Sequence, residues 1–143
     1  MHIEGEKRFA APPAEIYRAL TDPEALESAF SVIERVEAEG PRWTLVVRLP
    51  VPGGFRLNLS VRLEELREPE HARLRASGKS LGGRIAVDTS FDLAPDGEGT
   101  LMRWSAEIDA GGVLRGLGSQ SLAPLAKQHA ERALDRLVRP RVS

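Results

Sequence analysis

Histidine is the side chain whose pKa lies closest to neutral pH, and the chain carries three, His2, His71 and His129. His129 falls on the apolar stripe of the last predicted helix, so its imidazole is expected to face the interior. There it is either a hydrogen-bond partner for a ligand or a structural histidine. No second histidine lies four residues away, which argues against a metal site. His2 and His71 stand at the polar ends of predicted strands, and we expect both to be exposed.

A serine nucleophile needs a base within hydrogen-bond reach. Ser121 and His129 share one predicted helix, but eight residues separate them, which is roughly 12 Å along the axis. This distance excludes a Ser–His pair on that helix. The chain has no cysteine, which excludes thiolate nucleophiles, disulfides and cysteine-ligated metals.

Carboxyl groups that lie close together can act as general acid and base when they are buried. Glu64 and Glu65, and likewise Asp88 and Asp92, alternate with apolar residues in predicted strands, so we expect them to face solvent. The glycine pairs do not follow the strand, glycine loop and helix pattern of a phosphate-binding loop. We therefore predict no catalytic residue, no metal and no cofactor.

The elements that position these residues follow from the periodicity of the sequence. The segment from Phe55 to Leu66 alternates most clearly, with apolar residues on one face and polar or charged residues on the other. The expected strands are His2–Ala10, Val32–Glu39, Trp43–Leu49, Phe55–Leu66, His71–Lys79, Arg84–Ala94 and Leu101–Ala110. The expected helices are Ala14–Leu20, Glu24–Phe30 and a long one after Gly112, which extends to about Val138 and has a kink or a new start near Ser121 because of Pro124.

Consecutive strands joined by short turns form an antiparallel meander. The sheet has one apolar face and the last helix one apolar stripe, so each must bury the other. We predict a single α+β domain of residues 1–143, in which a curved seven-stranded antiparallel sheet wraps around the C-terminal helix. Curvature leaves an apolar cavity between the two. The residues expected to line it are Leu57, Leu59, Val61, Val87, Thr89, Phe91, Trp104, Ile108, Leu122, Leu125 and His129, and its apolar strand residues are expected to be buried.

Composition limits the partners of the chain. The net charge is −1, so no overall field attracts nucleic acid, and we predict no nucleic-acid partner. No apolar run approaches the roughly 20 residues that span a bilayer, so we expect no transmembrane segment. The N-terminus lacks the apolar region of a signal peptide, and a cytoplasmic location is expected by default.

The segment FAAPPAEIYRALTDPEAL, Phe9–Leu26, resembles the START/Bet v 1-like superfamily (SRPBCC, polyketide cyclase-like). Within it the chain is most similar to the CoxG branch, a family of carbon monoxide dehydrogenase subunits, through SGKSLGG at Ser77–Gly83 and GVLRGLGS at Gly112–Ser119. One departure is Ala29–Ile33, where that branch usually has a proline–glycine step. The resemblance implies a helix-grip fold with two short helices between the first and second strands.

The resemblance leaves two functional classes open. The first is binding or carriage of a hydrophobic small molecule (a lipid, quinone or polyketide-like compound), with the protein an accessory to a carbon monoxide dehydrogenase-type molybdenum hydroxylase. A peripheral membrane contact fits this class, although the chain's own residues do not support an anchoring role. The second class is a cyclase- or hydrolase-like enzyme that uses the same cavity. This second class needs at least two polar groups converging inside, and the inward face offers little beyond Thr89 and His129.

Overall fold

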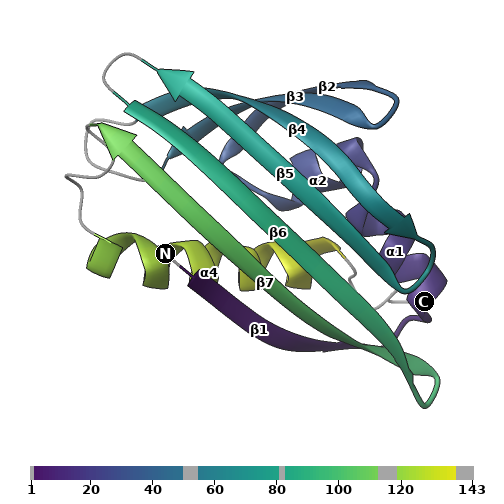
Figure 1. The fold of residues 1–143 in the computed structure, drawn as a ribbon. Helices are drawn as coiled ribbons and strands as arrows, with labels where there is room; N and C mark the ends of the chain where they lie inside the picture. Colours follow the sequence, from purple (N-terminus) through teal and green to yellow (C-terminus); the bar gives the residue numbers. More distant parts are fainter. Residues whose placement is uncertain (1, 50–54, 81–82, 113–118, 138–143) are drawn as a thin grey trace.

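The computed structural model describes residues 2–49, 55–80, 83–112 and 119–137 (Figure 1). Within them, seven strands form one antiparallel sheet in the order β1-β7-β6-β5-β4-β3-β2. The strands are β1 (His2–Phe9), β2 (Ile33–Glu39), β3 (Arg42–Leu49), β4 (Phe55–Arg67), β5 (His71–Ser80), β6 (Gly83–Asp96) and β7 (Gly99–Gly112). The helices are α1 (Pro13–Leu20), α2 (Pro23–Ala29) and α4 (Ser119–Leu137). The predicted order of elements and the predicted meander are confirmed.

Alternation along each strand decides which side chains face α4. The register places Leu59 opposite Gly78, and Val87 opposite Ile108 on its other side. These residues share the inner, concave face, whereas Arg56 and Arg62 are exposed on the outer face. The predicted assignment of residues to the two faces is therefore confirmed, because a slip of one residue would exchange them.

The hairpin between β6 and β7 is tighter than the sequence indicates. The two strands pair as far as Asp96 and Gly99, beyond the predicted ends at Ala94 and Leu101. A two-residue turn joins them, and Gly97 has a φ of +62°. A type II′ turn requires a positive φ at its first central residue, which glycine adopts without strain.

The two short helices begin at residues suited to helix starts and close one end of the sheet. The Asp22 carboxylate accepts a hydrogen bond of 3.1 Å from the backbone N–H of the residue two positions later, and Pro23 opens α2. From α1, Ile16 and Tyr17 are buried. The Tyr17 ring meets that of Phe91 edge-on, with centroids 6.0 Å apart. This contact fixes α1 against β6.

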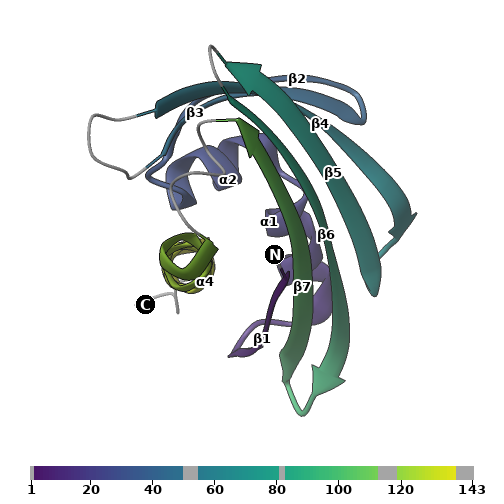
Figure 2. The ribbon, with the colours of Figure 1, turned by 60° about the vertical axis from the view of Figure 1, so that its left-hand side comes forward.

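Helix α4 lies across the concave side of the sheet (Figure 2). Its C-terminal part is held at two points, where Asp135 pairs with Lys7 of β1 and Arg136 donates a 3.5 Å hydrogen bond to the carbonyl of Ala29 in α2. Leu134 is buried in the core beneath it. These contacts attach α4 to the edge strand β1 and to α2.

Three predicted features fall partly or wholly outside the described residues. They are the turn at 50–54, the turn at 82–83 and the start of the last helix at 113–118. The predicted new helix start near Ser121 lies close to the observed start of α4 at Ser119, and Pro124 is accommodated inside α4. In the part of the chain with described coordinates, no helix has both the length and the hydropathy to cross a bilayer.

Candidate ligand cavity

A cavity of about 420 Å³ lies between the inner face of the sheet, α2 and α4. The described residues that line it are almost all apolar and come from both ends of the chain as well as from its middle. The sheet contributes Ile3, Val32, Ile33, Trp43, Leu45, Val47, Leu59, Val61, Leu74, Ala76, Ile85, Val87, Thr89, Phe91, Met102, Trp104, Ala106, Ile108 and Ala110. The helices contribute Leu20, Leu26, Phe30, His129, Ala130 and Leu134. The cavity thus occupies the space that the curved sheet leaves beneath α4.

Small side chains in the middle of the sheet make room for this cavity. Ala76 lies between Val61 and Val87 in the register, and Ala106 lies opposite Thr89. A methyl side chain in the middle strands reaches less far towards α4 than its larger neighbours. Packing that is dense around α1 therefore gives way to open volume towards β3 and β4.

Trp104 forms the boundary between the packed region and the cavity. Its indole lies over Gly5 of β1, where an added Cβ would approach the ring to 2.9 Å. Glycine is therefore required there for the ring to lie across β1. Trp104 is buried and also lines the cavity, so it combines a core role with a wall role.

The structure places eight of the predicted lining residues at the cavity, namely Leu59, Val61, Val87, Thr89, Phe91, Trp104, Ile108 and His129. Leu57 is buried instead in a packed cluster with Val47 and Leu59, and it is not among the described lining residues. The side chains of Leu122 and Leu125 lie outside the described part of the chain.

One expectation about burial is wrong. Val87 and Ile108 lie on the inner face as predicted, but they are partly exposed and not fully buried. The reason is the cavity itself, because these two cross-strand neighbours face open volume where a packed core would have covered them.

Sequence reasoning missed the wall formed by α2, β2 and β3. Phe30, Ile33 and Leu45 belong to this wall. The signal was present in the apolar spacing of α2 and the alternation of β3. What was lacking was the curvature that folds these elements over the cavity, as Figure 2 shows for α2, β2 and β3.

The polar groups of the described wall are few and carry no fixed charge. Thr89 donates its hydroxyl proton to the backbone carbonyl of Ser105 at 2.8 Å, so towards the cavity its oxygen retains acceptor capacity only. His129 is half-buried on α4 and lines the cavity. Beyond these two, the described wall offers the indole N–H groups of Trp43 and Trp104.

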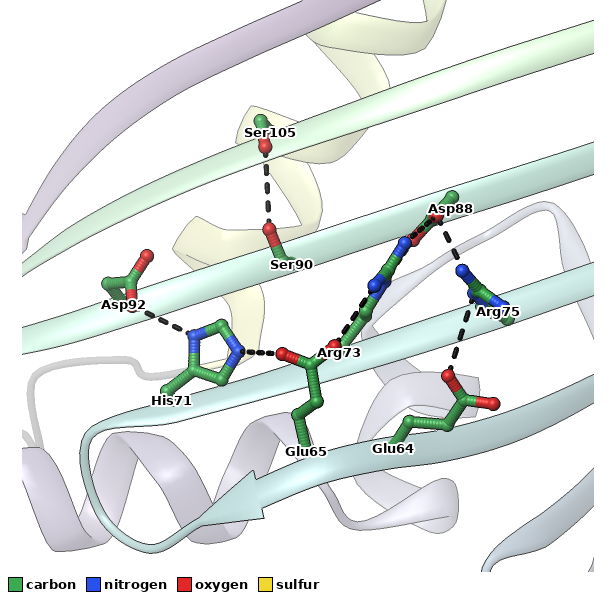
Figure 3. Close-up of polar contacts among 9 residues, drawn as sticks. All are labelled: Glu64, Glu65, His71, Arg73, Arg75, Asp88, Ser90, Asp92 and Ser105. Carbon is green, nitrogen blue, oxygen red and sulfur yellow. Dashed lines mark hydrogen bonds and ion pairs between the residues drawn. The ribbon is translucent and has the colours of Figure 1, made fainter.

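The outer face of the same sheet carries a network of charged side chains (Figure 3). His71 lies between Asp92, 2.8 Å from its Nδ1, and Glu65, 3.3 Å from its Nε2. Its side chain is only 13% exposed, so the expectation that His71 is exposed is wrong. The cross-strand carboxylate of Asp92 and the extra residues of β4 near Glu65 cover the ring.

Arg73 links this network to β6. It donates a 2.7 Å hydrogen bond to one oxygen of Asp88 and also contacts the other, while its Nη1 donates to Glu65 at 3.0 Å. Hydrogen bonding by Arg73 lowers the pKa of both carboxyl groups. The prediction that these acids face the outer side is confirmed, but ion pairs and not water alone surround them. No cluster of three or more metal-ligating side chains occurs in the described ranges.

An open curved sheet over one long C-terminal helix, with two helices after the first strand, defines the Bet v 1-like helix-grip fold. A conserved protein from Geobacillus kaustophilus superposes with a TM-score of 0.88 at 17% identity, covering 96% of this chain and 92% of that chain. A protein from Chromobacterium violaceum gives 0.75 at 22% identity and 97% of both chains. Ara h 8.0201 gives 0.66 at 14% identity, covering 96% of this chain and 94% of its own. These likenesses establish the fold, as predicted.

Residues 5–139 match the family model of CoxG, which describes carbon monoxide dehydrogenase subunits of the G type. The match spans nearly the whole chain, so the chain belongs to this family, as its resemblance predicted. A search of curated proteins found no match. The family and the fold agree over the same residues, which include both the sheet and α4.

Proposed function

We propose that the protein binds and carries a hydrophobic small molecule, such as a lipid, a quinone or a polyketide-like compound, in the cavity between the sheet and α4. The observation that carries this proposal is the character of the described wall, which is apolar except for Thr89, His129 and two indole N–H groups. Membership of the CoxG family and the Bet v 1-like fold both favour a ligand-binding or carrier role.

The size and chemistry of the cavity support this role. Its volume of about 420 Å³ falls within the range of small-molecule sites, which are usually apolar with a few placed polar groups. Each Å² of apolar ligand surface removed from water contributes about 25 cal/mol. A wall without fixed charge therefore favours ligands whose surface is mostly hydrocarbon or aromatic.

Two polar groups can orient such a ligand without catalysing a reaction. His129 can donate or accept one hydrogen bond, whereas Thr89 offers an acceptor because its proton is engaged by Ser105. General acid–base catalysis requires groups that exchange protons with the reacting atoms. The described wall supplies one such group, His129, so these residues favour carriage over the cyclase- or hydrolase-like alternative.

The partner proposed for this carrier is a carbon monoxide dehydrogenase-type molybdenum hydroxylase. The support is the name of the family to which the chain belongs. Analytical gel filtration of the purified protein mixed with such an enzyme tests this part. Co-elution is expected, and separate elution at micromolar concentrations of both proteins contradicts it.

A matched pair of substitutions tests whether the cavity is the binding site. Ala76→Phe adds a ring to the inner face of β5 within the cavity, whereas Ala86→Phe adds the same ring to the exposed outer face of β6. The probe is cis-parinaric acid, a fluorescent fatty acid, titrated into each protein. Ala76→Phe should reduce binding at least tenfold, and Ala86→Phe should leave it unchanged. Equal binding by all three proteins refutes the proposed site.

A further inference from the structure

The outer face of the sheet holds a row of three arginines on neighbouring strands. Arg42 of β3 is directly opposite Arg62 of β4, and Arg62 is directly opposite Arg75 of β5. Neighbouring strands are about 5 Å apart, so three cationic side chains leave the sheet side by side. Like charges directly opposite each other destabilise a sheet unless something compensates them.

Only one of these arginines is compensated within the described residues. Arg75 pairs with Glu64 at 3.5 Å and with Asp88 at 3.6 Å (Figure 3). Arg42 and Arg62 are exposed and have no ion pair with any described residue. Two adjacent guanidinium groups therefore keep their full donor capacity, five N–H groups each.

A row of hydroxyl groups lies beside the arginines. Thr44, Ser60 and Ser77 are cross-strand neighbours of one another, each two residues along its strand from an arginine of the row. All three are exposed. Together with the arginines they line a hollow of about 930 Å³ on the outer face. The hollow thus presents charged forks and neutral donors to one region of space.

Carboxylates border this basic strip on both sides. Glu37 and Glu39 of β2 lie on one side of the hollow, and Asp88, Glu107 and Asp109 of β6 and β7 lie on the other. The net charge of the whole chain is −1. A long polyanion such as RNA would cross these carboxylates and be repelled, so the arrangement favours a compact anion that stays within the strip.

We propose that this hollow binds a compact phosphoryl-class oxyanion, a phosphate or pyrophosphate group, through Arg42, Arg62 and Arg75 with hydroxyl donors from Thr44, Ser60 and Ser77. Guanidinium groups match phosphate oxygens two at a time, and hydrogen bonds between charged partners are about twice as strong as neutral ones. The site lies on the opposite face of the sheet from the cavity, so it is independent of the apolar ligand proposed above. The group belongs either to a soluble phosphate compound or to a lipid headgroup.

The test measures binding of inorganic pyrophosphate to the full chain by calorimetry at low salt. Arg62→Gln should weaken binding about tenfold, because it removes charged hydrogen bonds from the centre of the row. The matched control is Arg103→Gln, on the outer face of β7 outside the hollow, where Arg103 pairs with Glu6 at 3.1 Å. This control should leave the affinity unchanged. Arg62→Gln should also keep or raise the melting temperature without pyrophosphate, since it removes like-charge repulsion.

A second arm identifies the source of the group. Phosphatidylcholine vesicles with and without phosphatidic acid are added as competitors of pyrophosphate. Competition only by vesicles that contain phosphatidic acid supports the site with a lipid headgroup as its ligand, and absence of competition supports it with a soluble phosphate. No saturable binding of pyrophosphate, or equal weakening by Arg62→Gln and Arg103→Gln, overturns the proposal.

Discussion

The two faces of the sheet are built from the same strands, yet they differ in almost every physical respect. In β4, Leu59 and Val61 point into an apolar cavity, whereas Ser60 and Arg62 between them point outwards into a charged hollow. Inside, complementarity is set by volume and by small residues such as Ala76. Outside, it is set by charge pairs across strands. One alternating pattern therefore encodes two surfaces of different chemistry, one residue apart.

The faces also differ in how they tolerate change. Truncation on the inner face removes packing that no solvent can replace, whereas truncation on the outer face exposes groups that water already reaches. The consequences of substitution should therefore depend on residue parity more than on position along a strand.

The largest effect is expected at the packed end of the inner face. Phe91→Ala should lower the free energy of unfolding by about 3–5 kcal/mol, because the ring is buried and contacts Tyr17. Ser90→Ala, the neighbouring residue on the outer face, should change it by less than about 0.5 kcal/mol. Urea denaturation of both variants measures the difference, and similar losses for the two would contradict the division between faces.

A smaller effect is expected where the inner face is polar. His129→Ala should weaken binding of the apolar ligand about three- to tenfold, which corresponds to one hydrogen bond of about 0.5–1.5 kcal/mol, and should leave the fold intact. The measurement is a titration with the natural ligand, accompanied by a thermal melt. Unchanged affinity would make His129 a structural residue of α4.

The smallest effect concerns the outer network and depends on pH. Arg73 lowers the pKa of Asp88 below its ordinary value of 3.8, so the pair stabilises the fold above that value and the stabilisation is lost as pH falls through the lower folded pKa. Asp88→Asn should cost at most about 1 kcal/mol at pH 7, since the pair is partly exposed. Urea melts at pH 7 and near pH 3 check this, and the difference between wild type and variant should shrink in acid. A difference that grows in acid contradicts the assignment.

The fold was predictable because alternation, turn residues and helix starts all indicate the same elements. Leu57, Leu59 and Val61 mark the inner face of β4, and Asp22 with Pro23 marks the start of α2. Each of these signals is local, and each acts through backbone geometry that adjacent residues determine. Local signals therefore sufficed for the architecture.

The details of both sites depend on pairing between strands, which local signals do not specify. That Val87 and Ile108 stay partly exposed follows from curvature across the sheet, not from their own sequence context. His71 is covered because the register places Asp92 beside it. The row formed by Arg42 and Arg62 likewise emerges only when the strands are aligned, since these residues are far apart in sequence.

The central claim is that the cavity carries an apolar molecule, and native mass spectrometry tests it most directly. The protein is purified from its own host, measured intact, then denatured and extracted, with Ala76→Phe and Ala86→Phe treated in parallel. The wild type and Ala86→Phe should show an added mass that denaturation releases as one hydrophobic compound, and Ala76→Phe should lack it. Bare protein mass in all three samples, or the same bound compound in Ala76→Phe as in wild type, would contradict the account.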